Sequence, residues 1–364
     1  MRCAVVGSGL AGFVGYQALR AAGVPAEEIA VWGDHDDPAG AWRPRAAAIR
    51  QRRMRSESDG HCHPASFPGL APREAWRRRS LAPLAATAFD RYRPSVADFL
   101  SHVEELRVRS GWDRSLVARR AERVIAVAGG FEIDGEGPFA HVLVATGHPG
   151  LALPEELVDD PRVVHAYEPH EYASRVTVVG AGMAAATEWL NALASGAEVV
   201  SVRRREPLRR PLNVPRPLFS KRGLARFHTA PSAERAALLH EAGAPSYPVG
   251  REWDDPLERA TRDGRFRVEA SVNGSEQVIC ATGFRKGYRH DPLLARLVDD
   301  HALETHDRWL VLGSDATVPA LTGEGRTLAI AGVAAQWAYP AADTLMGMKY
   351  VGRRFARRVA CRTR

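Results

Sequence analysis

Three glycines near the start of the printed sequence, Gly7, Gly9 and Gly12, have a spacing that could bind the diphosphate of a dinucleotide. In such a loop the first glycine allows a tight turn, the second lets the backbone approach the diphosphate, and the third lets the helix pack closely on the strand. The free N–H groups and the dipole at the start of the following helix favour negative charge there. The residues expected to contact the diphosphate are Gly7, Gly9, Leu10, Ala11 and Gly12.

The same pattern returns about 170 residues later, as Gly180-x-Gly182-x-x-Ala185. An internal repeat of this kind implies two dinucleotide-binding units in one chain. The second diphosphate is expected to contact Gly180, Gly182, Met183, Ala184 and Ala185.

The residues at the end of the second strand of each unit decide whether that unit binds a ribose with free hydroxyls or one with a 2′-phosphate. An acid about 20 residues after the glycines can accept the ribose hydroxyls, and Asp34 is the best placed in the first unit. In the second unit the corresponding strand ends in Arg203-Arg204-Arg205. Arginine accommodates a 2′-phosphate, so we expect Arg203 and Arg204 to bind NADPH.

Strand–turn–helix patterns surround both glycine loops, as this chemistry requires. An apolar run at residues 4–6 predicts a strand, and residues 10–22 a helix that stops at Gly23. Residues 176–179 and a helix through Leu193, stopping at Gly196, repeat this order. Further strands are expected at 28–32, 119–127, 131–133, 140–144, 198–202, 309–312 and 327–333, further helices at 94–108, 232–241 and 341–359, and Asn273-Gly274 predicts a hairpin between 268–272 and 277–280.

The composition is that of a globular protein with two packed domains: 364 residues, of which 45% are hydrophobic. No run approaches eighteen apolar residues and no signal peptide is evident, so we expect a cytoplasmic protein without a membrane span. The four cysteines form no CxxC pair, which favours free thiols. The net charge of +7 arises from 50 basic and 43 acidic residues and favours anionic ligands rather than nucleic acid.

Residues 31–42, V-W-G-D-H-D-D-P-A-G-A-W, resemble the segment of two-dinucleotide flavoproteins in which an acid ends the second strand and a G-G-x-W follows. Those proteins include the flavin-containing, Baeyer–Villiger and N-hydroxylating monooxygenases. Gly33 stands where the family has glutamate, and Ala39 replaces the first glycine of the pair. Two A-T-G elements that close apolar strands extend the resemblance, Ala145-Thr146-Gly147 and Ala281-Thr282-Gly283.

This resemblance implies an α/β fold of two Rossmann-like three-layer dinucleotide-binding domains, with the NADPH domain inserted into the FAD domain. The implied boundaries are 1–149 for the first part of the FAD domain, 150–280 for the NADPH domain and 281–364 for the return segment of the FAD domain. The resemblance further implies that the last helix begins beneath the flavin pyrimidine. Many relatives have G-D where this chain has Gly332-Val333, so the usual contact of an aspartate with the flavin ribitol is absent. The implied cofactor contacts beyond the glycine loops are Asp34, Trp42, both A-T-G elements and Gly332.

The implied activity is that of a monooxygenase in which NADPH reduces FAD. The reduced flavin then binds molecular oxygen at C4a and transfers one oxygen atom to a small organic substrate. Two alternatives remain: an FAD/NADPH reductase or oxidase without oxygen insertion, and a nucleotide-sensing flavoprotein without turnover. No cysteine pair supports a disulfide reductase, while the fingerprint F-x-G-x-x-x-H-x-x-x-W/Y survives only as His165.

The loop at residues 43–80 corresponds in the family to one that passes near the flavin ring and the substrate. Its candidate catalytic residues are Ser56, Glu57 and His61. His61-Cys62-His63 lacks a second ligand pair at zinc spacing, so no metal site is expected. The oligomeric state stays open, with a homodimer as one option.

Overall fold

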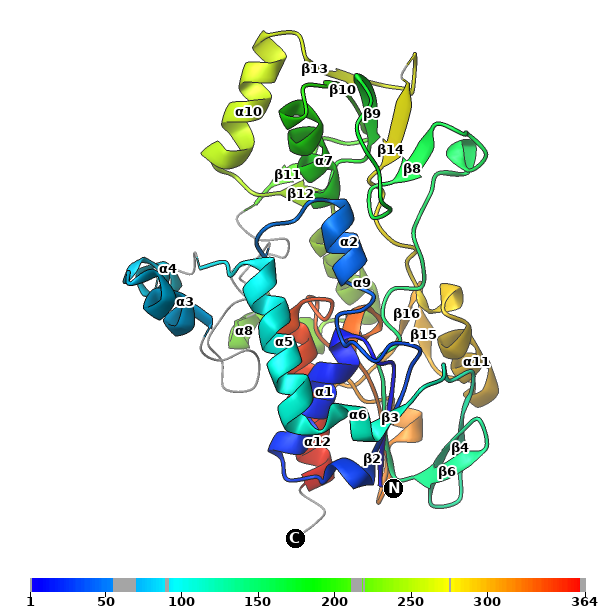
Figure 1. The fold of residues 1–364 in the computed structure, drawn as a ribbon. Helices are drawn as coiled ribbons and strands as arrows, with labels where there is room; N and C mark the ends of the chain where they lie inside the picture. Colours follow the sequence, from blue (N-terminus) through cyan, green and yellow to red (C-terminus); the bar gives the residue numbers. More distant parts are fainter. Residues whose placement is uncertain are drawn as a thin grey trace.

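The computed structural model describes residues 2–54, 70–88, 92–210, 218, 220–274 and 276–360. Two parallel β-sheets with helices packed on them confirm the predicted α/β class (Figure 1). The candidates Ser56, Glu57 and His61 lie outside the described residues.

The first sheet has the strand order β17-β7-β1-β2-β3, and all of its pairings are parallel. Its hydrophobic strands are buried, as expected for a parallel sheet covered on both faces. The strands are β1 (Cys3–Val6), β2 (Ile29–Trp32), β3 (Leu116–Val117), β7 (His141–Val144) and β17 (Thr327–Ile330).

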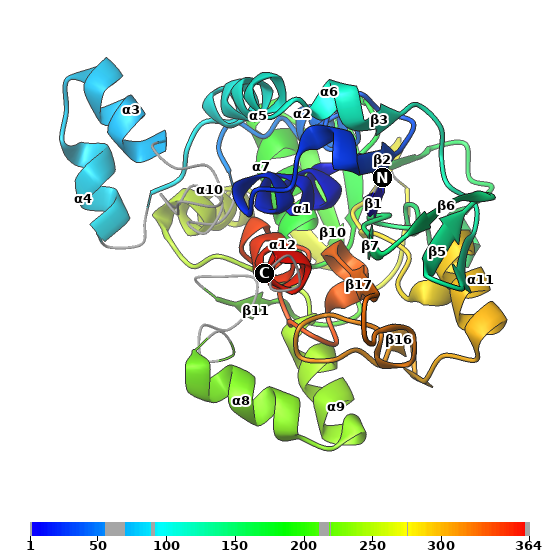
Figure 2. The ribbon, with the colours of Figure 1, turned by 90° about the horizontal axis from the view of Figure 1, so that it is seen from below.

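Helices and a small antiparallel sheet cover this first sheet. Helices α1 (Leu10–Ala21) and α12 (Leu345–Ala360) lie side by side on it (Figure 2). Strands β4 (Val124–Val127), β5 (Gly130–Ile133) and β6 (Glu136–Phe139) pack against the sheet, where the rings of Phe139 and Trp32 lie 5.1 Å apart. The outer helices are α5 (Val96–Ser110), α6 (Trp112–Ser115) and α11 (Pro292–His301).

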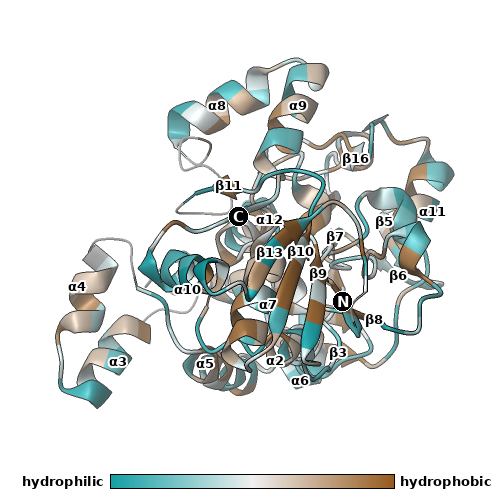
Figure 3. Ribbon diagram, turned by 90° about the horizontal axis from the view of Figure 1, so that it is seen from above, coloured by the Kyte–Doolittle hydropathy of each residue, from teal (hydrophilic) through white to brown (hydrophobic). Residues whose placement is uncertain are grey.

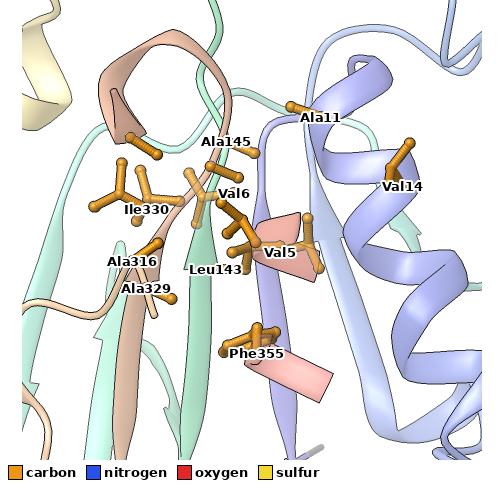
Figure 4. Close-up of a cluster of buried hydrophobic side chains, with 14 of the residues drawn as sticks. Val5, Val6, Ala11, Val14, Leu143, Ala145, Ala316, Ala329, Ile330 and Phe355 are labelled. Atoms are coloured by element: carbon orange, nitrogen blue, oxygen red, sulfur yellow. The ribbon is translucent and has the colours of Figure 1, made fainter. Parts of the chain in front are cut away.

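The core of the first unit lies between the sheet and the α1–α12 pair. Val5, Leu143 and Phe355 meet there and are fully buried (Figure 4). Each such side chain contributes roughly 1.5–3 kcal/mol by leaving water. This packing fixes the carboxyl ends of β1, β7 and β17 beside one another.

The second sheet has the order β13-β10-β9-β14-β8, again with parallel pairings throughout. Reading from its other edge, β9 has the place of β1, β10 of β2 and β14 of β7, so the sequence repeat is also a repeat of topology. The hydrophobic strands contrast with the hydrophilic helix α10 (Figure 3). The elements are β8 (Val163–His165), β9 (Arg175–Val179), α7 (Met183–Ala194), β10 (Glu198–Val202), α10 (Arg251–Arg262), β13 (Phe266–Glu269) and β14 (Gln277–Cys280).

The hairpin predicted at Asn273-Gly274 is wrong. Strands β13 and β14 are separated in the sheet by β10 and β9, and each pairs in parallel with its neighbours. A local turn signal could not reveal that both strands satisfy their hydrogen bonds with more distant partners. The predicted strand at 119–127 is likewise shortened to β4, and the last helix begins at Leu345 rather than at residue 341.

The remaining elements connect or extend the two units. Helices α3 and α4 project from the rest of the molecule in Figure 1. No helix among the described residues is long and apolar enough to cross a membrane. These elements are α2 (Arg43–Ala48), α3 (Leu70–Arg78), α4 (Ala82–Ala88), β11 (Leu208–Arg209), α8 (Lys221–Thr229), α9 (Ser232–Ala242), β12 (Ser246–Tyr247), β15 (Thr305–His306) and β16 (Trp309–Leu310).

The two units exchange parts of their hydrophobic cores. Ile49, which follows α2, packs in the core of the second unit, and its carbonyl accepts a hydrogen bond from Asn191 Nδ2 at 2.9 Å. Conversely, Phe227 of α8 and Leu239 of α9 belong to the core cluster of the first unit. The two hydrophobic cores therefore do not follow consecutive segments of the sequence, because each core contains residues from the segment of the other unit.

Candidate functional site

The first glycine loop lies against the Ala145-Thr146-Gly147 crossing. Gly7 has φ +118°, and a Cβ there would lie 2.2 Å from the carbonyl oxygen of Ala145, so only glycine fits. A Cβ on Gly12 would lie 1.9 Å from the carbonyl oxygen of Gly7, which explains the close contact of helix α1 with the turn. At Gly9, by contrast, nothing lies within 4 Å of the Cβ position. Open space beside the first N–H groups of α1 is what a diphosphate requires.

The second glycine loop repeats this relationship with the second crossing. Gly180 has φ +136°, and its Cβ would lie 2.5 Å from the carbonyl oxygen of Ala281. Gly182 has open space at its Cβ position, as Gly9 has. The third position is the buried Ala185 on α7, so this helix tolerates a methyl group where α1 does not.

The ends of the two second strands differ in charge and in exposure. Gly33 follows β2 and lies beside Ser8, whose Oγ would be only 2.0 Å from a Cβ on Gly33. The neighbouring Asp34 side chain is 62% exposed. At the end of β10, Arg203 is 14% exposed and pairs with Glu206 at 2.9 Å, whereas Arg204 is 88% exposed. Arg204 also has a partner, Glu156 at 3.2 Å, but its greater exposure makes it the freer of the two cations to reorient toward a ligand.

A cavity of about 1150 Å³ joins the second glycine loop to both crossings and to the C-terminal return segment. Arg203 and Arg204, which follow β10, line it, as do Val333 and Ala334 of the C-terminal segment. Gly147 also lines the wall, whereas the first glycine loop does not. The lining residues predicted from the sequence are Gly147, Gly180, Gly182, Met183, Ala184, Arg203, Arg204, Ala281, Thr282 and Gly283.

The predicted contacts of the first unit meet at the ends of its strands. Gly332 has φ +71°, and its Cβ would lie 3.3 Å from that of Ala11, so the return segment lies beside the start of α1. The Thr146 hydroxyl is buried and has no hydrogen-bond partner among the described residues. Trp42 instead packs on Phe99, with ring centroids 5.4 Å apart.

Charged side chains that the sequence analysis missed also line the cavity, among them Lys286, Arg308 and Asp343. Desolvation lowers the pKa of Lys286, and the positive charge of Arg308 adds to this effect. Asp343 is an exposed residue that lines the cavity, and desolvation by the surrounding protein raises the pKa of its carboxyl. Lys286 follows the second A-T-G by only three residues, so the basic run Arg285-Lys286 is the signal that could have identified it.

Aromatic and imidazole rings lie where the two crossings meet. His148 and Tyr167 both stack on Phe284, with ring centroids 4.0 Å and 5.1 Å away, and the Arg45 guanidinium lies 4.9 Å from the same ring. His165 Nε2 donates to the carbonyl oxygen of Gly283 at 3.0 Å. His165, the remnant of the fingerprint, thus contacts the second crossing.

The described residues give little support to a metal site or to a reactive cysteine. No cluster of three metal-ligating side chains occurs among them. Cys3 and Cys280 are buried in strands of different sheets, and burial raises the pKa of their thiols to about 12 and about 11. Thiols in those positions are poor nucleophiles at neutral pH.

No protein-family model and no curated protein sequence matches this chain. Solved structures share its fold. Ornithine hydroxylase from Pseudomonas aeruginosa has a TM-score of 0.69 at 18% identity, and covers 100% of this chain and 99% of its own. Kutzneria sp. 744 ornithine N-hydroxylase, solved with reduced FAD, NADP+ and L-ornithine, has a TM-score of 0.70 at 12% identity, with the same coverage.

A bacillithiol disulfide reductase from Bacillus cereus is also similar, with a TM-score of 0.60 at 15% identity over 99% of each chain. The resemblance read from short motifs is therefore confirmed at the level of the fold. That fold includes both oxygenases and a reductase. Fold alone does not determine which reaction a member performs.

Proposed function

We propose that this protein is an FAD- and NADPH-dependent monooxygenase that oxygenates a small organic substrate with molecular oxygen. FAD is assigned to the first unit, formed by residues 1–149 and 281–364, and NADPH to the second, formed by residues 150–280. The observation that carries the proposal is the repeated pairing of Gly7 with Ala145 and of Gly180 with Ala281, with one cavity reaching both crossings.

The first unit fits the diphosphate of FAD. The open space at Gly9 and the free N–H groups at the start of α1 form a cradle that a methyl group would fill. The unpartnered Thr146 hydroxyl is available to a ligand at the crossing. Bound FAD would accept hydride from NADPH and, once reduced, react with oxygen.

The second unit fits NADPH. Gly182 offers the same open cradle, and Arg204 has the exposure and the charge to bind a 2′-phosphate. The positive charges of Arg203, Lys286 and Arg308 along the cavity suit an anionic reductant. Because the cavity extends from Arg204 to Val333, a dinucleotide lying in it could reach the flavin side of Gly147.

The cavity walls also support exclusion of water from the reacting groups. Leu239, Leu294 and Trp309 contribute apolar surface to it, from α9, α11 and β16. Water exclusion protects a reduced flavin and its oxygen adducts from wasteful breakdown. An amine is the first substrate class to test, because two of the similar structures are named as an ornithine hydroxylase and an ornithine N-hydroxylase.

A reductase without oxygen insertion is the second candidate, favoured by the likeness to the bacillithiol disulfide reductase. Cys3 and Cys280 are too deeply buried, in separate sheets, to relay electrons to a disulfide. A reductase that uses only the described cysteines would therefore pass electrons from the flavin to a small acceptor or a partner protein.

The test is an absorption spectrum of the purified protein before and after anaerobic addition of NADPH. We expect a flavin spectrum that is bleached by NADPH faster than by NADH. A colourless protein that gains no thermal stability with FAD would overturn the proposal. A flavin spectrum that NADPH bleaches only slowly, even with candidate amines present, would favour a nucleotide sensor.

A further inference from the structure

Helices α8 and α9 form an arm. In the sequence the arm lies within the second unit, but its buried side chains pack in the hydrophobic core of the first. They are inserted between β11 and β12, and they project from the rest of the molecule in Figures 2 and 3. Nevertheless, Phe227, Ala236 and Leu239 lie in the same hydrophobic cluster as Trp337 and Tyr339. The arm therefore packs against residues 332–343 of the return segment, which the proposed function places beside the flavin.

A partly buried hydrogen bond joins the arm to this segment. His228 Nε2 lies 2.7 Å from the carbonyl oxygen of Ala338. Burial lowers the pKa of His228, so the ring is neutral at physiological pH. A carbonyl oxygen can only accept, and hence Nε2 carries the proton and donates it.

Arg235 holds the same junction from the second helix of the arm. Its guanidinium lies 5.1 Å from the centroids of both the Phe227 and the Trp337 rings. It also donates to the carbonyl oxygens of Phe227, at 3.1 Å, and His228, at 2.6 Å. One side chain thus fixes the end of α8, the position of His228 and a ring of the return segment.

The other end of the arm forms a wall of the cavity. Leu239 and residues 242–246 line it, and His240 packs on Trp309 with ring centroids 4.9 Å apart. The return segment contributes Val333, Ala334 and Asp343 to the same cavity. The arm is therefore in contact with both the cavity and the segment that closes its flavin end.

We propose that the α8–α9 arm positions the return segment against the flavin, with His228 and Arg235 as positioning residues. This inference rests on the proposed function for its flavin, but the contact of the arm with residues 332–343 can be tested without one. Loss of the His228 donor leaves a buried carbonyl unsatisfied and frees the segment to move.

The test compares His228→Ala, His228→Gln and Arg235→Gln with Arg226→Ala as a matched control. Arg226 lies on the same arm, but it is 77% exposed, and its one ion pair among the described residues is with Glu234, at 3.3 Å. Hydrogen exchange measured by mass spectrometry on the protein without added ligands gives the first readout. We expect exchange over residues 333–343 to rise several-fold in His228→Ala and Arg235→Gln, with exchange in β1 and β9 unchanged. His228→Gln, which retains an N–H donor, should recover part of the protection.

The FAD dissociation constant and the flavin absorption spectrum give the second readout, which a merely structural contact would not change. We expect the dissociation constant to rise about three- to tenfold in His228→Ala and to stay unchanged in Arg226→Ala. The inference would be overturned if His228→Ala and Arg235→Gln exchanged residues 333–343 at the wild-type rate. It would also be overturned if exchange rose but flavin binding stayed unchanged. If the wild-type protein binds no FAD at all, the proposed function fails and the positioning of the flavin fails with it. Exchange would still report whether the arm holds the segment.

Discussion

The ring of His148 stacks on the ring of Phe284, with centroids 4.0 Å apart and planes at 17° to each other. His148 follows the first A-T-G element and Phe284 follows the second. The two crossings between the units, which are 136 residues apart in the sequence, therefore meet through these two rings. Both residues line the cavity, so this contact forms part of its wall.

This stack predicts a specific dependence of stability on pH. Burial lowers the pKa of His148 from its ordinary value of 6.5 to about 4, with a further contribution from Arg45. Between these values the unfolded chain binds more protons than the folded protein, so the free energy of unfolding falls as the pH drops from 6.5 toward 4. His148→Phe keeps a stacked ring but removes the group that titrates. As the pH drops from 6.5 toward 4, the free energy of unfolding of this variant should therefore fall by about 1–2 kcal/mol less than that of the wild type.

Urea denaturation at pH 7 and at pH 4.5 measures the difference. His290→Phe is the control, because His290 is exposed and lies outside the stack. Equal losses of stability in wild type and in His148→Phe would contradict the lowered pKa of His148 in the folded protein.

The glycines of the first loop should separate cofactor binding from folding. Gly9→Ala places a methyl group in the open cradle, so the protein should keep its melting temperature but bind FAD about tenfold or more weakly. Gly12→Ala drives a methyl group into the carbonyl oxygen of Gly7, so it should lower the melting temperature by several degrees. Thermal melts and flavin titration of both variants provide the measurement.

Gly182→Ala is the matched variant in the second unit. It should weaken NADPH binding without displacing FAD, because its open cradle lies on the second loop. If Gly9→Ala and Gly182→Ala impaired both nucleotides equally, the assignment of one nucleotide to each loop would be wrong.

The sequence predicted these loops well because each is a local unit of strand, turn and helix. The close contact of Gly7 with Ala145, however, joins residues 138 positions apart, and only the repeated A-T-G hinted at it. The arm at residues 221–242 was predicted in part as a helix, but its packing on Trp337 depends on long-range contacts that no local period encodes. The Asn273-Gly274 hairpin failed for the same reason, since the pairing of β13 and β14 was decided by β10 and β9.

The arginines at the end of β10 should select NADPH over NADH. Replacing both Arg203 and Arg204 with alanine should raise the Michaelis constant for NADPH by about tenfold or more, because a charge-assisted contact to the 2′-phosphate contributes roughly 1.5–3 kcal/mol. The constant for NADH should change little. Arg251→Ala is the control, since Arg251 is an exposed arginine of the same unit with a partner at 3.6 Å, Asp255. If the double variant raised the Michaelis constants for both nucleotides equally, the arginine run would not select the 2′-phosphate and would be only surface charge.

The last prediction concerns the class of reaction. If the chain is a monooxygenase, mixing the NADPH-reduced protein with oxygen in a stopped-flow instrument should show a transient species that absorbs between reduced and oxidised flavin. Opening the cavity wall with Leu239→Ser should shorten the life of this species and raise the yield of hydrogen peroxide, because Leu239 lines the cavity and helps to exclude water. Arg226→Ala, on the exposed face of the same arm, should leave both quantities unchanged. Reoxidation in a single step, together with rapid reduction of quinones or ferricyanide, would instead identify a reductase.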